Sequence, residues 1–298
     1  MSLEKNKPLV SVLLNCFNSS KFISKAIKSI IDQSYENWEL IIWDDGSTDD
    51  TVKVIKKFQD KRIKLYLEKN NVGLGKSRLK AIKKINGSLV AILDSDDYYH
   101  PDKITQQVKI FDKFPGVSIC STWTKTYNQD EKLLSLFNMN GDNSRIKKKL
   151  MYVNLLPHSS IMYRKLSAQK VSWYSNNLEY SQDYDLTLKL IAEEEFYLIK
   201  EYLTYTLNSE NNMTNSKKLR SVIIQENIFI LKNTLNFARS NYDKSIIKSI
   251  IDINLIKLNL IELKFNFLKC MVNLFKVFIK NPLIIFKFNL IKSLKKNL

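Results

Sequence analysis

The chain has 298 residues, of which 44% are hydrophobic and 11% aromatic. This composition can bury a sizeable core, so it excludes wholesale disorder and fits one large α/β domain or one domain with an appendage. The formal net charge is +17, and from Lys217 onward there are 16 Lys or Arg against 4 Asp or Glu. A basic C-terminal segment favours an anionic partner, such as a lipid surface, a phosphorylated acceptor or nucleic acid.

The cysteines and the hydropathy pattern indicate a reducing compartment. Cys16, Cys120 and Cys270 are far apart and show no Cys-x-x-Cys spacing, which argues against disulfides and a zinc site. The chain begins with charged residues and contains no run of about 18 uncharged apolar residues. We therefore expect no secretory signal, no membrane-spanning helix and a cytoplasmic location.

The first 115 residues alternate between strand-like and helix-like patterns, which predicts a mostly parallel sheet. Apolar runs predict the strands, and apolar residues at helical spacing predict the helices. Pro101 is expected to open a further helix. The predicted strands are Val10–Leu14, Trp38–Trp43, Ile63–Leu67 and Leu89–Leu93, and the predicted helices are Ser19–Gln33, Thr48–Phe58 and Gly75–Ile85.

The pattern changes after residue 115. Val117–Tyr127 and Lys132–Phe137 are typical of antiparallel strands, and shorter elements follow them. From about Asn215 the remaining sequence predicts helix. The shorter elements are a strand at Ser160–Tyr163, a helix at Asp183–Ala192 and a strand at Tyr197–Leu207.

Three predicted strands run into unusually polar segments: Asn15-Cys16-Phe17-Asn18, Asp44-Asp45-Gly46-Ser47 and Asp94-Ser95-Asp96-Asp97. Ligands of an open α/β sheet bind beyond the carboxyl ends of its strands. Carboxylates crowded there repel one another unless a cation joins them, and Mg²⁺ or Mn²⁺ commonly combines one or two carboxylates with substrate phosphates. The pattern favours a metal–diphosphate site; the alternative is that these Asp residues are ordinary turn and cap residues.

The order and spacing of these segments resemble family 2 glycosyltransferases. The resemblance covers Val10–Asp102 most closely and includes Asn71-Val72-Gly73 with Ser77 and Arg78 between the two acidic motifs. It implies a GT-A fold: a Rossmann-like nucleotide-sugar-binding catalytic domain over 1–214, with a nucleotide-binding half (1–115) and an acceptor-binding half (116–214). A helical, basic amphipathic extension over 215–298 would follow.

The resemblance also implies donor-binding roles. Asn15 and Phe17 fall where the family contacts the nucleoside, and the Phe17 ring could stack on the base. Asp45 falls where a carboxylate accepts the imide hydrogen of uracil, which favours a UDP-sugar donor. Arg78 falls where a cation approaches the nucleotide. Asp94, Ser95 and Asp96 form the metal motif for Mn²⁺ or Mg²⁺, with Asp96 the direct ligand and Asp94 beside it.

The segment Ser181-Gln182-Asp183-Tyr184-Asp185-Leu186 is similar to the family's acidic pair ahead of a helix. This implies that Asp183 is the base that takes the acceptor hydroxyl proton, an inverting mechanism; the alternative is a carboxylate that stabilises the helix dipole. Gln182 stands where the family usually has Glu. His158, in Pro157–Arg164, is expected on the acceptor side or in a structural role, and Gln182 is also expected on the acceptor side.

One departure from the family concerns the end of the strand at Tyr205-Thr206-Leu207. Many members place a His or Arg after this strand, whereas this chain has Asn208, Asn211 and Asn212. Either the diphosphate is held differently or the metal has fewer protein ligands.

The C-terminal helix carries one narrow polar stripe on an otherwise apolar surface. This pattern predicts burial against the catalytic domain or a second subunit, or contact of 252–298 with an anionic membrane at the inner face of the cell membrane. The stripe consists of Asn259, Glu262, Asn266, Lys269, Asn273, Lys276 and Lys280, and Lys292, Lys295 and Lys296 follow Pro282.

The sequence therefore predicts a transferase that uses a nucleotide-sugar donor and a saccharide or lipid-linked saccharide acceptor, in assembly of cell-envelope polysaccharide or glycolipid. A nucleotidyltransferase would need a Gly-rich phosphate loop after the first strand, and a dinucleotide oxidoreductase would need Gly-x-Gly-x-x-Gly; both are missing. No nucleic-acid reader motif occurs in the basic tail. A non-catalytic protein that binds sugar nucleotides or anionic surfaces is the alternative.

Overall fold

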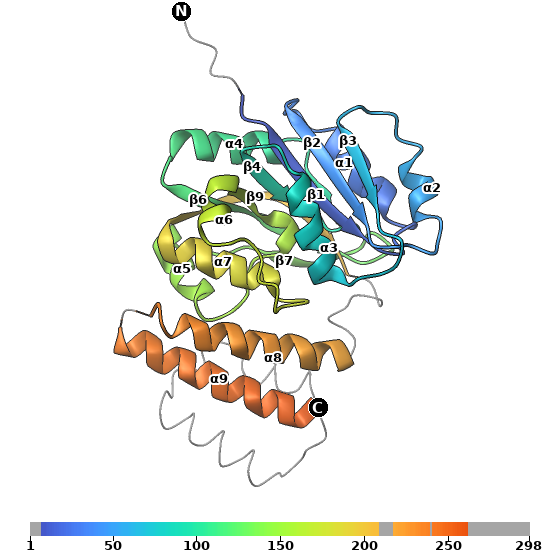
Figure 1. The fold of residues 1–298 in the computed structure, drawn as a ribbon. Helices are drawn as coiled ribbons and strands as arrows, with labels where there is room; N and C mark the ends of the chain where they lie inside the picture. Colours follow the sequence, from blue (N-terminus) through green and yellow to red (C-terminus); the bar gives the residue numbers. More distant parts are fainter. Residues whose placement is uncertain (1–6, 209–216, 239, 262–298) are drawn as a thin grey trace, which may run out of the picture. The chain divides into compact units, whose positions relative to one another are not determined.

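The computed structural model describes residues 7–208, 217–238 and 240–261. The chain divides into two compact units, Met1–Lys147 with Leu155–Ser209, and Lys148–Asn154 with Glu210–Leu298. Within the described residues, the first unit contains a nine-stranded sheet of order β3-β2-β1-β4-β8-β6-β9-β5, with β7 paired to β6 (Figure 1). The predicted α/β class is confirmed.

The N-terminal half of the sheet is parallel, as predicted. It consists of β1 (Val10–Cys16), β2 (Trp38–Asp44), β3 (Ile63–Leu67) and β4 (Leu89–Ile92). Helices cover both faces of such strands, so apolar residues are needed at nearly every position, and β1, β2 and β4 are indeed almost entirely buried.

The second half of the sheet is mixed. β8 (Met162–Arg164) pairs antiparallel with β4 and with β6 (Val117–Tyr127), and β6 pairs antiparallel with β7 (Leu133–Phe137), as predicted for that hairpin. β9 (Glu195–Leu207) pairs with β6 in parallel, and the two-residue β5 (Tyr98–Tyr99) pairs antiparallel with β9. The sequence did not predict β5, which is too short to show a period.

Helices lie on both faces of the sheet (Figure 1). One face carries α1 (Ile23–Ile31), α2 (Thr51–Ile55) and α4 (Lys103–Lys113), and their apolar side chains share a core with β1 and β2. The other face carries α3 (Leu74–Ala81) and α7 (Gln182–Glu193). The remaining helices of this unit are α6 (Lys165–Lys170), the 3₁₀ turns η1 (Ile82–Lys84) and η2 (His158–Ser160), and α5 (Asn143–Leu150), whose last residues belong to the second unit.

The helix predicted over Ser19–Gln33 begins only at Ile23, and the reason lies in Ser19. Its backbone N–H donates to Thr51 Oγ1 at 2.7 Å, and its hydroxyl lies 2.8 Å from Ser95 Oγ. Ser19 therefore belongs to the loop that follows β1. The helix predicted over Thr48–Phe58 is likewise shorter in the structure and spans only α2.

The second unit contains α8 (Lys217–Thr234) and α9 (Asn241–Ile261). The predicted helical character of the C-terminal extension is confirmed within the described residues. A turn at 235–237 follows α8, and Ile228 and Leu231 share a core with Ile247 and Ile251. Among the described residues, no helix is both long and apolar enough to cross a bilayer. Cys270 and the predicted polar stripe beyond Asn259 lie outside the described residues.

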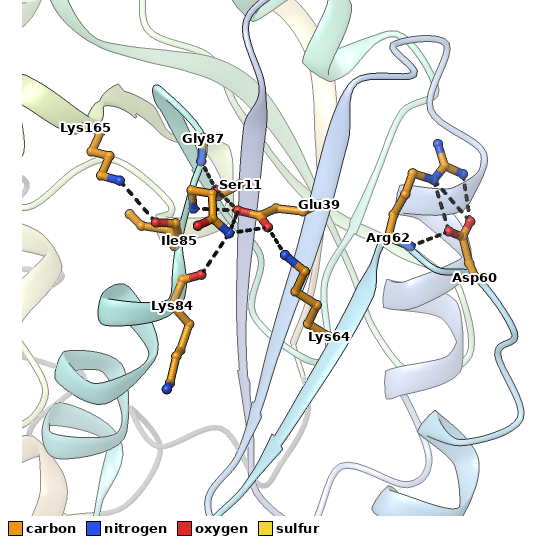
Figure 2. A network of polar contacts seen from close by, with 10 residues as sticks. Ser11, Glu39, Asp60, Arg62, Lys64, Lys84, Ile85, Gly87 and Lys165 are labelled. Carbon is orange, nitrogen blue, oxygen red and sulfur yellow. Dashed lines mark hydrogen bonds and ion pairs between the residues drawn. The ribbon is translucent and has the colours of Figure 1, made fainter.

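A buried carboxylate, Glu39, joins four segments near the amino ends of the parallel strands (Figure 2). Glu39 is 4% exposed and accepts hydrogen bonds from Ser11 Oγ at 2.6 Å and Lys64 Nζ at 2.7 Å. Asn86 donates to it through its backbone N–H at 2.6 Å and through its side-chain amide at 2.9 Å. β1, β2, β3 and the entry to β4 thus meet at one charged group.

Gly87 completes this junction, because its backbone N–H donates to Ser11 Oγ at 2.8 Å. A Cβ at position 87 would lie 2.5 Å from Leu9 O and 2.6 Å from Ser11 N. The close approach of the two backbones therefore requires glycine. Burial alone would raise the pKa of Glu39, but the bonds from Lys64, Ser11 and Asn86 outweigh it and lower the pKa to about 2.

This pKa predicts how stability depends on acid. A depressed folded-state pKa contributes stability that is complete above the unfolded value of about 4.5 and is lost as the pH falls toward 2. We expect Glu39→Gln to lower the free energy of unfolding at pH 7 by on the order of 2 kcal/mol. The deficit should shrink between pH 5 and pH 2 in urea titrations monitored by circular dichroism.

Glu36→Gln is the matched control, since Glu36 is exposed and lies three residues earlier. It should change the free energy of unfolding by less than about 0.5 kcal/mol at either pH. A Glu39→Gln deficit that stays constant from pH 7 to pH 2 would contradict the assignment.

Candidate active site

The structure places the three polar strand ends side by side, because β1 lies between β2 and β4. Two backbone bonds extend the parallel pairing beyond the strands: Leu93 N to Leu13 O at 3.0 Å, and Asp45 N to Cys16 O at 2.9 Å. The segments after β1, β2 and β4 therefore share the carboxyl edge of the sheet, where ligands of such folds bind.

The segment after β4 crowds three carboxylates into four residues. Burial and the negative charge of Asp94 raise the pKa of Asp96 to about 6. Burial, Asp96 and Asp94 raise the pKa of Asp97 well above its usual range. Burial also acts to raise the pKa of Asp94, but His158, whose Nδ1 lies 3.4 Å from Asp94 Oδ1, helps to hold it below the usual value. The carboxylates therefore carry uncompensated electrostatic repulsion.

A divalent cation fits this crowding, since it would remove the repulsion that disfavours ionised Asp96. Among the described residues, no three His, Cys, Asp or Glu side chains are grouped to hold a metal ion. Asp94 and Asp96 would thus supply only part of a coordination sphere. Oxygen ligands from a bound diphosphate and water would complete it, which is the usual arrangement for Mg²⁺.

The loops after β1 and β2 are tied together by side chains. Asn18 is in the left-handed conformation (φ 49°), and its Oδ1 accepts a hydrogen bond from the Thr48 N–H at 2.8 Å. Gly46 (φ +77°) must be glycine, because a Cβ would meet the backbone of Asn70 at 2.7 Å. Phe17 protrudes from this junction with 45% of its surface exposed, which is unusual for a large apolar ring beside a buried strand.

Asp45 is only 3% exposed and faces the segment before α3. Its two carboxylate oxygens accept hydrogen bonds from the backbone N–H groups of Val72 and Gly73, both at 3.0 Å. Each oxygen keeps a second lone pair for a further donor. Burial still raises the pKa of Asp45 above its usual value, against the effect of these two bonds.

Helix α3 contributes a buried cation. Arg78 is 4% exposed, and its guanidinium carbon lies 5.4 Å from the centre of the Tyr174 ring. Its Nη1 is buried and makes no hydrogen bond within the described residues. The preceding residue, Ser77, accepts a hydrogen bond from Asn15 Nδ2 at 3.2 Å, so Asn15 is oriented toward the same helix.

The first turn of α7 is fastened to the first turn of α3. Gln182 is fully buried, and its Nε2 donates to Ser175 O at 2.9 Å and Gly75 O at 3.4 Å. The Gly75 N–H donates to Glu179 Oε1 at 3.1 Å, and a Cβ on Gly75 would lie 2.7 Å from Leu178 O. This contact requires glycine and places Asp183, at the start of α7, beside the donor half.

Tyr174 gives an independent indication that the charged residues are close together. Burial raises its pKa to about 12, and Arg78 opposes that rise whereas Asp183 and Asp94 add to it. Residues from α3, α7 and the acidic segment therefore lie within electrostatic range of one hydroxyl. The sequence offers no signal for Tyr174, because it lies in an irregular segment outside the motifs.

His158 is almost fully buried and lies in η2, next to Asp94. Its Nε2 is buried and makes no hydrogen bond within the described residues. Asn208 is exposed, and its backbone N–H donates to Tyr127 O at 2.8 Å, which extends the pairing of β9 with β6. Asn211 and Asn212 lie outside the described residues.

Residues 11–177 match the family model described as glycosyl transferase family 2. An uncharacterized glycosyltransferase of Methanocaldococcus jannaschii is 30% identical over 223 residues, which span 72% of this chain and 77% of that protein.

Two solved structures resemble the chain. S. aureus TarS 1–349 in complex with UDP-GlcNAc has a TM-score of 0.62 at 20% identity and covers 86% of this chain and 73% of its own. A mannosyltransferase from Pyrobaculum calidifontis in complex with GDP-Man and Mn²⁺ has a TM-score of 0.65 at 13% identity, covering 98% and 85%. These likenesses confirm the predicted GT-A fold.

Proposed function

The chain belongs to glycosyl transferase family 2 and is a glycosyltransferase, and we propose that it transfers a sugar from a UDP-sugar to a saccharide or lipid-linked saccharide hydroxyl with inversion. The observation that most supports this proposal is the arrangement of Asp94, Asp96, Arg78 and Asp183 at one edge of the sheet. Two crowded carboxylates suit a cation, the buried guanidinium suits a phosphate, and the separate carboxylate suits a base.

The donor would bind along the ends of β1 and β2. The exposed Phe17 ring offers a surface for stacking the base, and Asn15 lies next to it on β1. Asp45 has lone pairs left to accept a uracil imide hydrogen beside its two backbone bonds. The TarS structure holds UDP-GlcNAc, which is consistent with a UDP-linked donor here.

We propose Mn²⁺ or Mg²⁺ as the cofactor, held by Asp96 directly and by Asp94 beside it, next to Ser95. When bound, such a cation stabilises the negative charge of a leaving diphosphate. Arg78 would bind the same diphosphate through its buried Nη1. The mannosyltransferase from P. calidifontis binds GDP-Man together with Mn²⁺, which supports a metal requirement in this fold.

Asp183 would act as the base. The acceptor hydroxyl gives its proton to the Asp183 carboxylate, and the oxygen attacks the anomeric carbon in line. The bond from that carbon to the diphosphate oxygen breaks, and the nucleoside diphosphate leaves with the bonding electrons. One displacement inverts the anomeric centre. Gln182 fixes the first turn of α7, and His158, which lies beside Asp94, would face the acceptor.

The donor assignment predicts metal-dependent hydrolysis. Incubated with UDP-, GDP- and dTDP-sugars, the protein should release nucleoside diphosphate slowly from a UDP-sugar, and only when Mn²⁺ or Mg²⁺ is present. Asp96→Ala should reduce release at least 100-fold, because it removes the direct ligand. The readout is nucleoside diphosphate by chromatography. Absence of both release and metal-dependent nucleotide binding across the panel would contradict the proposal.

The base assignment predicts a different defect. Asp183→Asn should lower kcat for transfer by about 10²–10⁴ while UDP affinity stays unchanged, because the base acts only in the chemical step. Asp185→Asn is the matched control, since Asp185 lies on the same helix and pairs with Lys189 at 2.5 Å. It should lower thermal stability but leave kcat within a fewfold. Equal kcat losses in both variants would contradict the role of Asp183.

We further propose that the second unit contacts an anionic membrane at the inner face of the cell membrane, through 252–298 and neighbouring residues. In the described part, large apolar side chains are 41–54% exposed on a unit that also carries many Lys. Apolar and cationic residues together suit an anionic interface, where a lipid-linked acceptor would reside. The exposed side chains are Phe229, Phe237, Tyr242 and Leu255.

This surface predicts cosedimentation of the full chain with phosphatidylglycerol vesicles, but not with phosphatidylcholine vesicles. Binding should weaken as salt rises from 0.05 to about 0.5 M, because charge attraction is screened. A homodimer buried through the same face would instead give a concentration-dependent mass in light scattering and no vesicle binding. Salt-sensitive binding to duplex DNA at equal affinity would favour a general anion-binding surface over a membrane.

A further inference from the structure

Two buried side chains, Ser159 and Asp97, make hydrogen bonds that fix the conformation of the acidic segment Asp94–Asp97. Ser159 is fully buried and Asp97 is 6% exposed. Ser159 Oγ donates to Asp97 Oδ2 at 2.5 Å and accepts the backbone N–H of Asp94 at 3.0 Å. The Asp97 N–H donates to Asp94 O at 3.1 Å, which closes the turn. The backbone of Asp94 is therefore fixed at both its N–H and its carbonyl.

Asp97 also reaches the last residue of β9. Its Oδ1 accepts the backbone N–H of Leu207 at 3.0 Å, a contact between residues 110 apart in sequence. The carboxylate of Asp97 thus joins the acidic segment to the carboxyl end of β9.

The segment that contains Ser159 is hydrogen-bonded to two neighbouring elements of the fold, α4 and β6. Ser160 O accepts a hydrogen bond from Gln107 Nε2 at 3.0 Å, and Ser160 Oγ lies 2.7 Å from Ser121 Oγ on β6. Gln107 in turn accepts a hydrogen bond from the buried Lys103 at 2.8 Å. The segment that carries the Ser159 hydroxyl is therefore hydrogen-bonded to α4 and β6.

We infer that Ser159 and Asp97 are positioning residues for cation and donor binding: they fix the Asp94–Asp97 turn so that Asp94 and Asp96 share one cation, and they join this turn to the end of β9. The inference rests on the proposed function. Within the described residues no third His, Cys, Asp or Glu joins the two carboxylates, so a cation held there would depend on the exact placement of Asp94 and Asp96.

Two variants test this role in different ways. Ser159→Ala removes the donor to Asp97 and the acceptor for the Asp94 N–H. Asp97→Asn keeps the shape and an oxygen for the Leu207 N–H, but its amide nitrogen cannot accept the Ser159 hydroxyl proton. Both changes leave Asp94, Asp96 and Asp183 in place.

Ser160→Ala is the matched control. Ser160 is equally buried and adjacent to Ser159, but its hydroxyl contacts Ser121 and Pro157 rather than the acidic segment. Both alanine variants therefore remove one buried hydroxyl from the same turn. A purely structural role predicts similar effects on stability and on ligand binding in the two variants.

The measurement is a Mn²⁺ titration of the full-length protein in the presence of UDP, followed by electron paramagnetic resonance of free Mn²⁺ and by calorimetry. Urea unfolding of each variant is measured in parallel. We expect Ser159→Ala and Asp97→Asn to raise the Mn²⁺ concentration for half-saturation about 10-fold or more. Ser160→Ala should stay within twofold of wild type despite a comparable loss of stability.

Wild-type affinity for Mn²⁺ and UDP in both Ser159→Ala and Asp97→Asn would overturn the positioning role while leaving the proposed function intact. An equal loss in Ser160→Ala would also overturn it, because the effect would then come from general loosening of η2. If the wild-type protein itself binds no UDP in a metal-dependent way, the proposed function fails, and the inference fails with it.

Discussion

Repulsion among the carboxylates that follow β4 is the constraint around which this site is organised. Asp94, Asp96 and Asp97 lie within one turn, and the negative charges of the others contribute to raising the pKa of Asp96 and Asp97. The turn keeps its shape because the Ser159 hydroxyl and the Leu207 N–H donate to the Asp97 carboxylate, while the Asp94 N–H donates to the Ser159 hydroxyl oxygen. In the proposed function, the crowded negative charge of this turn would bind a cation.

Buried carboxylates have different surroundings at the amino ends and at the carboxyl ends of the parallel strands. At the amino edge, four donors surround Glu39, its pKa falls to about 2, and the four strands are held in order. At the carboxyl edge, Asp96 has no such set of donors, and its pKa rises to about 6. The satisfied carboxylate contributes stability, whereas in the proposed function the unsatisfied ones would bind a cation.

Sequence reasoning succeeded where local pattern decides the structure. Buried parallel strands need apolar runs, so β1 to β4 were predictable, and so was the polarity of the segments after them. It failed where long-range contacts decide. The contact of Asp97 with Leu207 spans 110 residues, the parallel pairing of β6 with β9 leaves no local period, and the turn at 235–237 contains no Gly or Pro to mark it. Ser159 lies within the segment Pro157–Arg164, but no local pattern reveals its hydrogen bond to Asp97.

Gln182 shows how the segments around α3 and α7 depend on each other. The family resemblance implies Glu at this position, yet here the Gln182 side chain is fully buried, and its amide nitrogen donates to two backbone carbonyls, Ser175 O and Gly75 O. An ionised Glu would bring its charge toward both carbonyls with no proton to donate. The amide therefore suits a chain in which the first turns of α3 and α7 are joined. That junction fixes the first turn of α7, which contains Asp183, relative to the first turn of α3, so Gln182 acts through geometry rather than through charge.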